Sequence, residues 1–430
     1  MILTENGSLS LQERRARVLG PAYRLFYREP VQIIRGAGTR LYDADGVEYL
    51  DAYNNVPAVG HCHPRVVEAQ SRQAQILNTH TRYLSSGLVD YAERLVDTFP
   101  EALSNVMFTC TGSESVDLAL RIARHGRTGT GVVVTENAYH GTTAAAAAIS
   151  PSLGVAMPLG ANVRVVPAPR RLEGLDVGAK FAADVTAAIE DLNRHGHGVA
   201  ALITDTIFSS DGVHPDPAGF LKPAVDAVHR ASGVFIADEV QPGFGRTGTG
   251  MWGFDRHGVV PDLVVMGKPM GNGMPIAAVV TRPELLAEFG STVRYFNTFG
   301  GNPVAIAAAN AVLDVIEDEN LVANAAAVGA YLLEQLRHIT AEHEAVGALR
   351  GTGLFIGLET IDAAGRLDPG AADTLVNLYR EHHVLVGLAG KGNTAVKIRP
   401  PLSFSHADAD RFLDVTRQAL ATLRPTVRKG

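Results

Sequence analysis

The sequence predicts an α/β fold, with a mostly parallel central sheet in a large domain and a smaller α+β domain beside it. Between about Leu50 and Asn310, short apolar runs typical of buried strands alternate with alanine-rich stretches typical of helices. This alternation indicates strands joined by helices, which is how parallel sheets are built. The chain has 430 residues, of which 46% are hydrophobic, so it can bury the cores of about two domains.

The elements follow from local patterns. Residues 305–316 predict a long helix that leads into a second unit of helices and short strands, and GLFIGLE at 353–359 predicts one of those strands. The alanine run at 144–148 is expected to be a packed segment. The expected strands of the central sheet include Val132 to Thr135, Ala200 to Thr204, Val234 to Ala237 and Leu263 to Met266.

These elements divide the chain into three parts. We expect an N-terminal segment over residues 1–50 that joins the small domain, a large domain over residues 51–310, and a C-terminal small domain over residues 311–430. No internal repeat interrupts this plan.

Charge and composition exclude several classes of protein. A net charge of -7 lacks the basic footprint of nucleic-acid binders, and two cysteines cannot form a disulfide framework. No apolar run approaches the roughly 20 residues of a membrane span, and no secretory apolar region precedes residue 30, so we expect a cytoplasmic protein. The tripeptide His61-Cys62-His63 supplies neither the ligand count nor the spacing of a metal site, so we expect no metal.

Lys268 is one of only six lysines, and it directly follows the apolar run Val264-Val265-Met266. A lysine at the end of a buried strand loses hydration, which lowers its pKa and lets a neutral amine attack a carbonyl. The position therefore suits a Schiff-base lysine. A surface lysine with a buried stem is the alternative, and this segment alone does not decide between them.

Asp238 and Glu239 stand where another predicted strand ends, within VFIADEVQPGFGRTG at 234–248. Open parallel sheets bind ligands beyond the carboxyl ends of their strands, so Asp238 and Lys268 could share one crevice. The protonated pyridine of pyridoxal 5'-phosphate (PLP) would pair with such a carboxylate, and PLP is an electron sink for carbanion chemistry. A structural ion pair is the alternative.

Thr111-Gly112-Ser113 opens a helical pattern in which Val116 and Leu120 share a face. A helix N-terminus offers free backbone N–H groups to an anion, so Gly112 and Ser113 are candidates for holding a cofactor phosphate. An ordinary capped helix would show the same pattern.

These motifs, with YHG at 139–141 and NTFGGNP at 297–303, resemble the class III aminotransferases, which are fold type I PLP enzymes, over nearly the whole chain from about residue 20. The resemblance implies that Lys268 forms the Schiff base with PLP and that Asp238 pairs with the pyridine nitrogen. It implies a homodimer with active sites at the subunit interface. The other cofactor residues it implies are Gly112 and Ser113 at the phosphate, Tyr139 on the ring with His140 beside it, Val240 against the ring, Gln241 near the ring hydroxyl, and Thr298 at the phosphate of the other subunit.

Two positions depart from the usual transaminase pattern. Family transaminases carry an arginine three residues before a Pro-Pro pair near the C-terminus, where this chain has Lys397 in VKIRPPL. They also tend to have Glu-Pro where this chain has Asp205-Thr206, so the resemblance supports a cofactor role for Asp205 only weakly. A lysine is a point charge and does not replace the planar fork of an arginine that holds a carboxylate.

Within the family, the chain is most similar to the phospholyase branch that acts on O-phosphoethanolamine and phosphohydroxylysine. The similarity lies in YNNVPAVGHCHPRVVEA at 53–69, LNTHTRYL at 77–84, DYAERL at 90–95 and the lysine before Pro-Pro, whereas DTIFSSDG at 205–212 differs. The candidates for binding a substrate phosphate are Asn78, Thr81, Arg82 and Lys397, with Tyr23 and Arg399 as weaker ones. For each of them, a solvated or interface side chain is the alternative.

The expected reaction is the elimination of phosphate from O-phosphoethanolamine to acetaldehyde, ammonia and phosphate. Lys268 would take the proton from the carbon that bears the amine. A class III transaminase that acts on omega-amines or amino acids with a 2-oxo acid as acceptor is the alternative.

Overall fold

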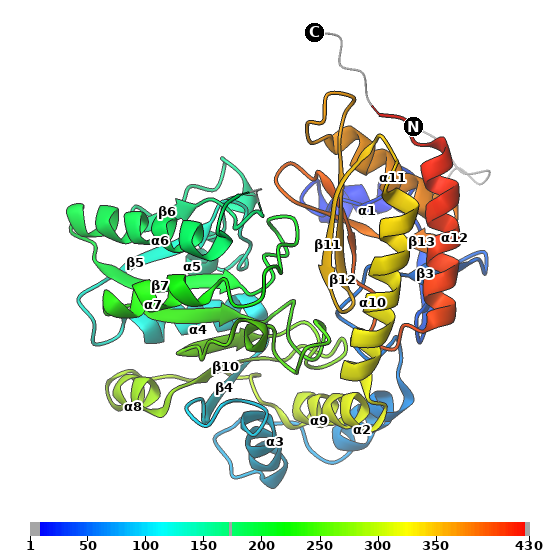
Figure 1. The fold of residues 1–430 in the computed structure, drawn as a ribbon. Coiled ribbons are helices and arrows are strands. Elements are labelled where there is room, and N and C mark those ends of the chain that lie inside the picture. Colours follow the sequence, from blue (N-terminus) through cyan, green and yellow to red (C-terminus); the bar gives the residue numbers. More distant parts are fainter. Residues whose placement is uncertain (1–8, 172–173, 426–430) are drawn as a thin grey trace.

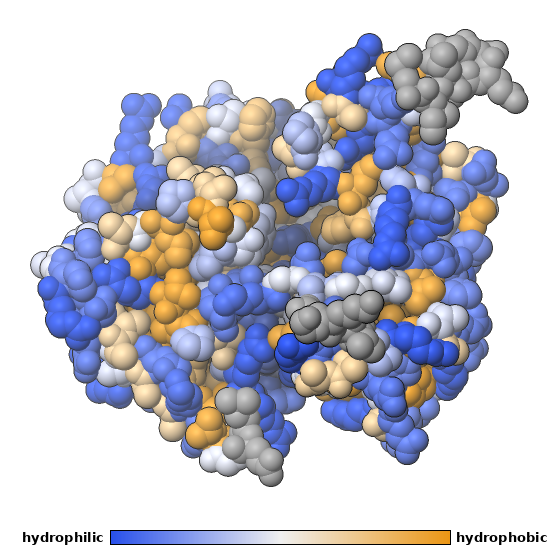
Figure 2. Space-filling view, turned by 90° about the horizontal axis from the view of Figure 1, so that it is seen from above, coloured by the Kyte–Doolittle hydropathy of each residue, from blue (hydrophilic) through white to orange (hydrophobic). Residues whose placement is uncertain are grey.

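The computed structural model describes residues 9–171 and 174–425. It shows two halves, one built around a large sheet and one around the elements near the two ends of the chain (Figure 1). Seen from above, the surface is hollowed between these halves (Figure 2). None of the described helices is long and apolar enough to cross a membrane.

The central sheet has seven strands in the order β4-β10-β9-β8-β7-β5-β6. All neighbours pair in parallel except β10, which is antiparallel to both β9 and β4, so the expected mostly parallel sheet is confirmed. The strands span β4 Asn105–Thr109, β5 Gly131–Thr135, β6 Val163–Val166, β7 Val199–Asp205, β8 Val234–Asp238, β9 Leu263–Met266 and β10 Ala277–Thr281.

Helices cover both faces of this sheet, which explains why its inner strands are apolar at nearly every position. Val134 and Ile236 face one core together with α4, whereas Val133 and Phe235 face the other core together with α6 and α7. The first face carries α4 (Gly112–Arg124), α5 (Ala144–Ala147) and α8 (Pro283–Thr292), and the second carries α6 (Val177–Arg194) and α7 (Lys222–Arg230).

The other half contains two four-stranded sheets. One is antiparallel, in the order β11-β12-β15-β14, and the other joins the N-terminal strands β1, β2 and β3 to β13 from near the C-terminus. Their strands span β1 Ile33–Ala37, β2 Arg40–Asp43, β3 Glu48–Asp51, β11 Val346–Thr352, β12 Phe355–Thr360, β13 Val384–Leu385, β14 Gly387–Ala389 and β15 Ala395–Ile398.

Helices pack against these sheets and connect the two halves. The predicted helix at 305–316 is α9, which is longer than expected because Asn302 caps it and Pro303 starts it. The helices span α1 Leu11–Leu19, α2 Pro64–Ala74, α3 Ser86–Val96, α9 Pro303–Asp318, α10 Leu321–Thr340, α11 Pro369–Glu381 and α12 His406–Thr422, with short 3-10 turns at Pro151–Leu153 and Gly253–His257.

The predicted strand at 353–359 begins two residues late. Gly353 has a φ of +51° and forms the turn between β11 and β12, so β12 starts at Phe355.

The pairing of β3 with β13 links the N-terminal segment to the C-terminal elements. The boundaries at residues 50 and 310 remain our proposal, and residues 1–8 and 426–430 of the outer segments lie outside the described residues.

Candidate active site

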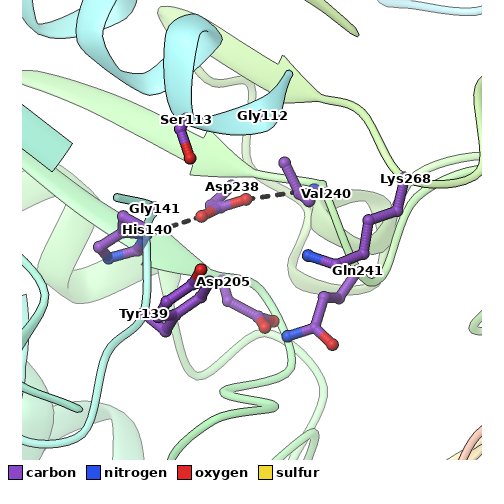
Figure 3. A pocket seen from close by; sticks show the side chains of 10 residues that line it. All are labelled: Gly112, Ser113, Tyr139, His140, Gly141, Asp205, Asp238, Val240, Gln241 and Lys268. Atoms are coloured by element: carbon purple, nitrogen blue, oxygen red, sulfur yellow. Dashed lines mark hydrogen bonds and ion pairs between the residues drawn. The ribbon is translucent and has the colours of Figure 1, made fainter. Parts of the chain in front are cut away.

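A cavity lies at the edge of the central sheet where the parallel strands end (Figure 3). Asp205 ends β7 and Asp238 ends β8, and the two are register partners. Lys268 follows the end of β9, the next strand in the sheet. The residues that line the cavity are Gly112, Ser113, Tyr139, His140, Gly141, Asp205, Asp238, Val240, Gln241 and Lys268.

Asp238 is held from two sides. Its Oδ2 lies 2.6 Å from Nδ1 of His140, and its Oδ1 accepts a hydrogen bond of 3.1 Å from the backbone N–H of Val240. Both side chains of the histidine–aspartate pair are almost fully buried. Because an ionised carboxylate only accepts, His140 donates from Nδ1. The pair presents a fixed carboxylate to the cavity.

The Nε2 atom of His140 is buried and finds no hydrogen-bond partner within the described residues. Within the described residues, His140 thus forms hydrogen bonds with its side chain through Nδ1 alone. His140 is therefore a positioning residue for Asp238, with its second nitrogen left free inside the protein.

Lys268 is partly buried, and no hydrogen bond or ion pair holds its amine within the described part of the chain. Burial lowers the pKa of Lys268, and the positive charge of Arg399 lowers it further, against the opposing charges of Asp238 and Asp205. This environment favours the neutral amine that can attack a carbonyl or accept a proton.

The start of α4 forms a tight cradle. Thr111 caps the helix by accepting a 3.2 Å hydrogen bond from the N–H of Glu114. A Cβ atom on Gly141 would lie 2.4 Å from Oγ of Ser113, and the φ of +134° at Gly141 also favours glycine. The free N–H groups of Gly112 and Ser113 therefore lie at the cavity with a bare backbone opposite them, which suits a phosphate group.

A chain of hydrogen bonds links the C-terminal half to Asp205. Arg399 donates from Nη1 to Oε1 of Gln241, and Nε2 of Gln241 donates to Oγ of Ser209 over 2.5 Å. The Ser209 hydroxyl then donates to Oδ2 of Asp205. Since both ends of the Gln241 amide are engaged, its orientation is determined by this chain.

Two buried carboxylates differ in their role. Burial raises the pKa of Asp205, the Ser209 hydrogen bond opposes this, and the charge of Asp238 adds to it. Burial also raises the pKa of Glu239 to about 8. Glu239 does not line the cavity; it accepts hydrogen bonds from Thr206 and from the N–H groups of Gly253 and Phe254, and so fixes the loop after β8.

Lys397 and Arg399 approach the cavity from β15 in the other half of the molecule. Burial, together with the charges of Arg399 and Lys268, lowers the pKa of Lys397 to about 7. Arg399 also donates from Nε to the carbonyl of Tyr53 over 3.0 Å. Lys397 has no such partner in the described residues and is therefore the cation that stays available to a bound anion.

Nine of the predicted site residues meet in this cavity, and Lys397 and Arg399 lie next to it. Five other predicted residues, all exposed, do not line it: Tyr23, Asn78, Thr81, Arg82 and Thr298. Thr81 and Arg82 line a different cavity, where the guanidinium of Arg82 lies 3.9 Å from the ring centre of Phe296.

Two residues of the site were not among the predicted ones. Gly141 belongs to the YHG motif. Its backbone lies so close to Ser113 that a side chain would not fit, and the sequence pattern alone does not indicate this contact. Ser209 lies in DTIFSSDG, the segment that departs from the phospholyase pattern. That departure was the one feature of the sequence that could have drawn attention to Ser209 as a site residue.

The histidines of the His-Cys-His tripeptide have separate partners. His61 lies 2.6 Å from Asp51, and His63 lies 3.1 Å from Glu319. Among the described residues, no group of three or more His, Cys, Asp or Glu side chains could hold a metal ion.

The cavity matches the chemistry of PLP at three points. The helix start and Gly141 leave room and donors for a phosphate, Asp238 offers a fixed carboxylate for a protonated pyridine nitrogen, and Lys268 offers a desolvated amine for the aldehyde. The residues present therefore fit the cofactor.

Comparison with known proteins agrees with this geometry. The family model for aminotransferase class-III matches residues 26–420. The chain is 42% identical to the alanine–glyoxylate aminotransferase 2-like protein of Drosophila melanogaster, over 94% of this chain and 85% of that protein. It is 36% identical to the ethanolamine-phosphate phospho-lyase homolog 1 of Caenorhabditis elegans, over 91% of this chain and 89% of that protein.

A solved structure is also very similar. A phospholyase from Arthrobacter in complex with phosphoethanolamine superimposes with a TM-score of 0.94 at 44% identity, covering 96% of this chain and all of that one. Together with the family match, this result confirms the expected fold and cofactor. The chain belongs to the class III aminotransferases, the PLP-dependent enzymes of fold type I.

Proposed function

We propose that this protein is a phospho-lyase that eliminates phosphate from O-phosphoethanolamine to give acetaldehyde, ammonia and inorganic phosphate. The observation that carries the proposal is the unpartnered cation Lys397 beside Lys268 and Arg399. Arg399 and the ammonium form of Lys397 place positive charge at this cavity, and a phosphate dianion compensates that charge better than a single carboxylate does. The similarity to the phosphoethanolamine-bound phospholyase supports the same substrate class.

The chain's own residues can perform such an elimination. When bound, PLP supplies an electron sink for the carbon that carries the amine. Asp238, oriented by His140, keeps a proton on the pyridine nitrogen, and Nζ of Lys268 removes the proton from the substrate carbon. The C–O bond to phosphate on the neighbouring carbon then breaks, with Lys397 stabilising the departing dianion. Water hydrolyses the resulting enamine to acetaldehyde and ammonia.

The alternative is amino-group transfer from an omega-amine or amino acid to a 2-oxo acid. The Drosophila and human relatives named as aminotransferases favour it, at 42% and 32% identity. Against it, Lys397 occupies the position where a family transaminase would carry the carboxylate-binding arginine, and Arg399 already binds Gln241 and Tyr53. The carboxylate of an amino-acid or 2-oxo-acid substrate would therefore find no free arginine at this position to bind both of its oxygens.

One assay separates the two reactions. We would incubate the PLP-loaded enzyme with O-phosphoethanolamine and measure inorganic phosphate and acetaldehyde, and in parallel offer pyruvate or glyoxylate as acceptors. Release of phosphate and acetaldehyde in equal amounts without an acceptor is the expected result. Ready amino transfer without phosphate release would overturn the lyase proposal.

We also propose that the enzyme is a homodimer with shared active sites. Thr298, Asn78 and Arg82 are exposed and outside the cavity of their own chain, so their predicted roles require a second chain. Large apolar side chains are exposed nearby, including Ile76, Leu77, Tyr83, Leu84 and Phe299. A cluster of this kind marks an interaction surface.

Mixing inactive variants tests the sharing. If Arg82 serves the partner's site, an Arg82→Ala subunit and a Lys268→Ala subunit form a hybrid with one intact site. Random reassortment then restores about a quarter of the wild-type activity, because half of the dimers are hybrids with one good site each. No recovery, with dimers verified by light scattering, would place Arg82 at the site of its own chain. We keep a cytoplasmic location as a proposal, which fractionation of the cells would test.

A further inference from the structure

A second cavity, of about 520 Å³, lies at the junction of the two halves and is lined by four arginines. Arg170 follows β6 in the large-sheet half, Arg337 belongs to α10, and Arg350 belongs to β11. The cavity has none of the PLP-site residues described above. Guanidinium groups thus converge on it from both halves.

The carboxylates in this cavity form a close ion pair with only one of its four arginines. Glu359 is engaged by Arg350, whose Nη2 and Nη1 lie 2.7 Å and 3.1 Å from its two oxygens. Asp216 pairs with Arg256, which does not line the cavity. Arg170 reaches Glu359 only at 4.0 Å.

Arg171 and Arg337 have no ion-pair or hydrogen-bond partner for their side chains within the described residues. His214, also in the wall, is buried, and burial together with the charges of Arg350 and Arg170 lowers its pKa to about 3, so it is neutral at physiological pH. The cavity therefore holds an excess of positive charge from Arg170, Arg171 and Arg337.

We infer that this cavity binds the phosphate group of a small molecule, at a site separate from the PLP cavity. Guanidinium forks bind phosphate oxygens in pairs, which makes arginine clusters suited to phosphate more than to chloride or other point anions. The volume exceeds what a phosphate alone fills and is in the range of small-molecule sites, and Pro215, Ala348 and Leu349 offer apolar wall for the rest of an ester.

The wall of this cavity is continuous with the loop that carries Asp205 and Ser209. Arg350 donates from Nε to the carbonyl of Val213 and from Nη2 to that of Gly212. Two residues earlier than Val213, Asp211 accepts hydrogen bonds from Thr135 and from the N–H of Asn137. A ligand in the arginine cavity thus touches the same loop that supports the PLP site.

Calorimetric titration of inorganic phosphate into the PLP-loaded enzyme tests the inference. The wild type should show two sites for each chain, one of which is lost in Lys397→Ala. The other should persist in Lys397→Ala and weaken about tenfold or more in Arg337→Gln and in Arg171→Gln, because each removes one charged donor. Arg230→Gln, which neutralises an exposed arginine at the end of α7 outside the cavity, is the matched control.

A parallel titration with glycerol 3-phosphate distinguishes the source of the phosphate group. Tighter binding of the ester than of inorganic phosphate indicates an organic ligand, and equal binding indicates free phosphate. Thermal unfolding of each variant verifies that it is folded. If Arg171→Gln and Arg337→Gln bind phosphate with the same number of sites and affinity as Arg230→Gln, the arginine cavity is not a phosphate site. The Lys397→Ala titration keeps this outcome independent of the proposed lyase reaction.

Discussion

The Nδ1 atom of His140 lies 2.6 Å from Oδ2 of Asp238, although the two residues are 98 positions apart in the chain. This contact joins the loop after β5 to the end of β8 and holds in place the carboxylate that would pair with the pyridine nitrogen of bound PLP. The carboxylate is therefore preorganised before any ligand arrives, and preorganised charges contribute strongly to catalysis.

The substitution Asp238→Asn should slow turnover by about a hundredfold or more. The amide removes the negative charge that keeps a proton on the pyridine nitrogen, and preorganised electrostatic groups of this kind contribute about 3 kcal/mol. Steady-state kinetics at saturating PLP would measure the loss. A decrease below about tenfold would contradict the role of Asp238.

Lys268→Ala should abolish both turnover and the covalent attachment of PLP. PLP can still bind noncovalently through Asp238 and the start of α4, so equilibrium dialysis should detect bound cofactor while the visible absorption band of the Schiff base is missing. Lys391, which is exposed and paired with Glu136, provides a control as Lys391→Ala. Turnover of Lys268→Ala near the wild-type rate would exclude it as the catalytic lysine.

Ser209→Ala should weaken PLP binding and turnover together. The substitution removes the hydroxyl that links the Gln241 amide to the Asp205 carboxylate, and leaving the buried Gln241 amide unsatisfied costs about 1 to 3 kcal/mol. Ser210→Ala is the matched control, since it removes a neighbouring hydroxyl that makes no hydrogen bond to Asp205 or Gln241. Fluorescence titration with PLP compares the two variants, and equal affinities would show that the bridge is dispensable.

Lys397→Ala should lower kcat/KM for O-phosphoethanolamine about ten- to a hundredfold and leave the cofactor spectrum unchanged. A charge-assisted contact to phosphate contributes about 1.5 to 3 kcal/mol, and Lys397 makes no contact assigned to PLP. Normal kinetics in this variant, together with normal kinetics in Arg82→Ala, would remove the support for a phosphorylated substrate.

Binding of a phosphomonoester that lacks an amine, such as ethyl phosphate, should weaken as the pH rises through about 7. The pKa of Lys397 is lowered to about 7, so its ammonium form prevails below that pH and is lost above it. The phosphoryl group is mostly a dianion above about pH 6, so it does not account for the decline. Inhibition constants between pH 6.5 and 9 would measure the effect. Lys397→Arg keeps its positive charge over this range, so binding of ethyl phosphate to this variant should not depend on pH. If binding to Lys397→Arg still weakens as the pH rises, the titrating group is Lys268 instead.

The sequence predicted those parts of the fold and site that depend on short segments. The apolar runs before Asp238 and Lys268 are β8 and β9, and their parallel pairing brings both residues to one edge of the sheet. The start of α4 at Gly112 likewise follows from its Thr111 cap. For the two strands the local pattern is sufficient because neighbouring parallel strands end together, and for the helix it is sufficient because the cap is adjacent in the sequence.

Contacts between distant segments were not predictable in the same way. Ser209 lies only four residues after Asp205, but its contact with Gln241 joins the loop after β7 to the loop after β8, and no spacing in the sequence expresses that contact. The convergence of Arg170 and Arg337 depends on how the two halves meet. Arg82 and Thr298 lie outside the cavity of their own chain, so the roles proposed for them depend on a second chain.

The charged residues in and beside the cavity come from two structural units with different tasks. Asp238 ends a strand of the central sheet and Lys268 follows one, whereas Lys397 belongs to β15 of the other half and Arg399 follows it. Under the proposed function, the side chains at and just after β15 select the anionic part of the substrate, and the central sheet supplies the catalytic base and the partner of the cofactor. A substitution on one unit is then expected to change substrate choice without changing the residues that hold PLP.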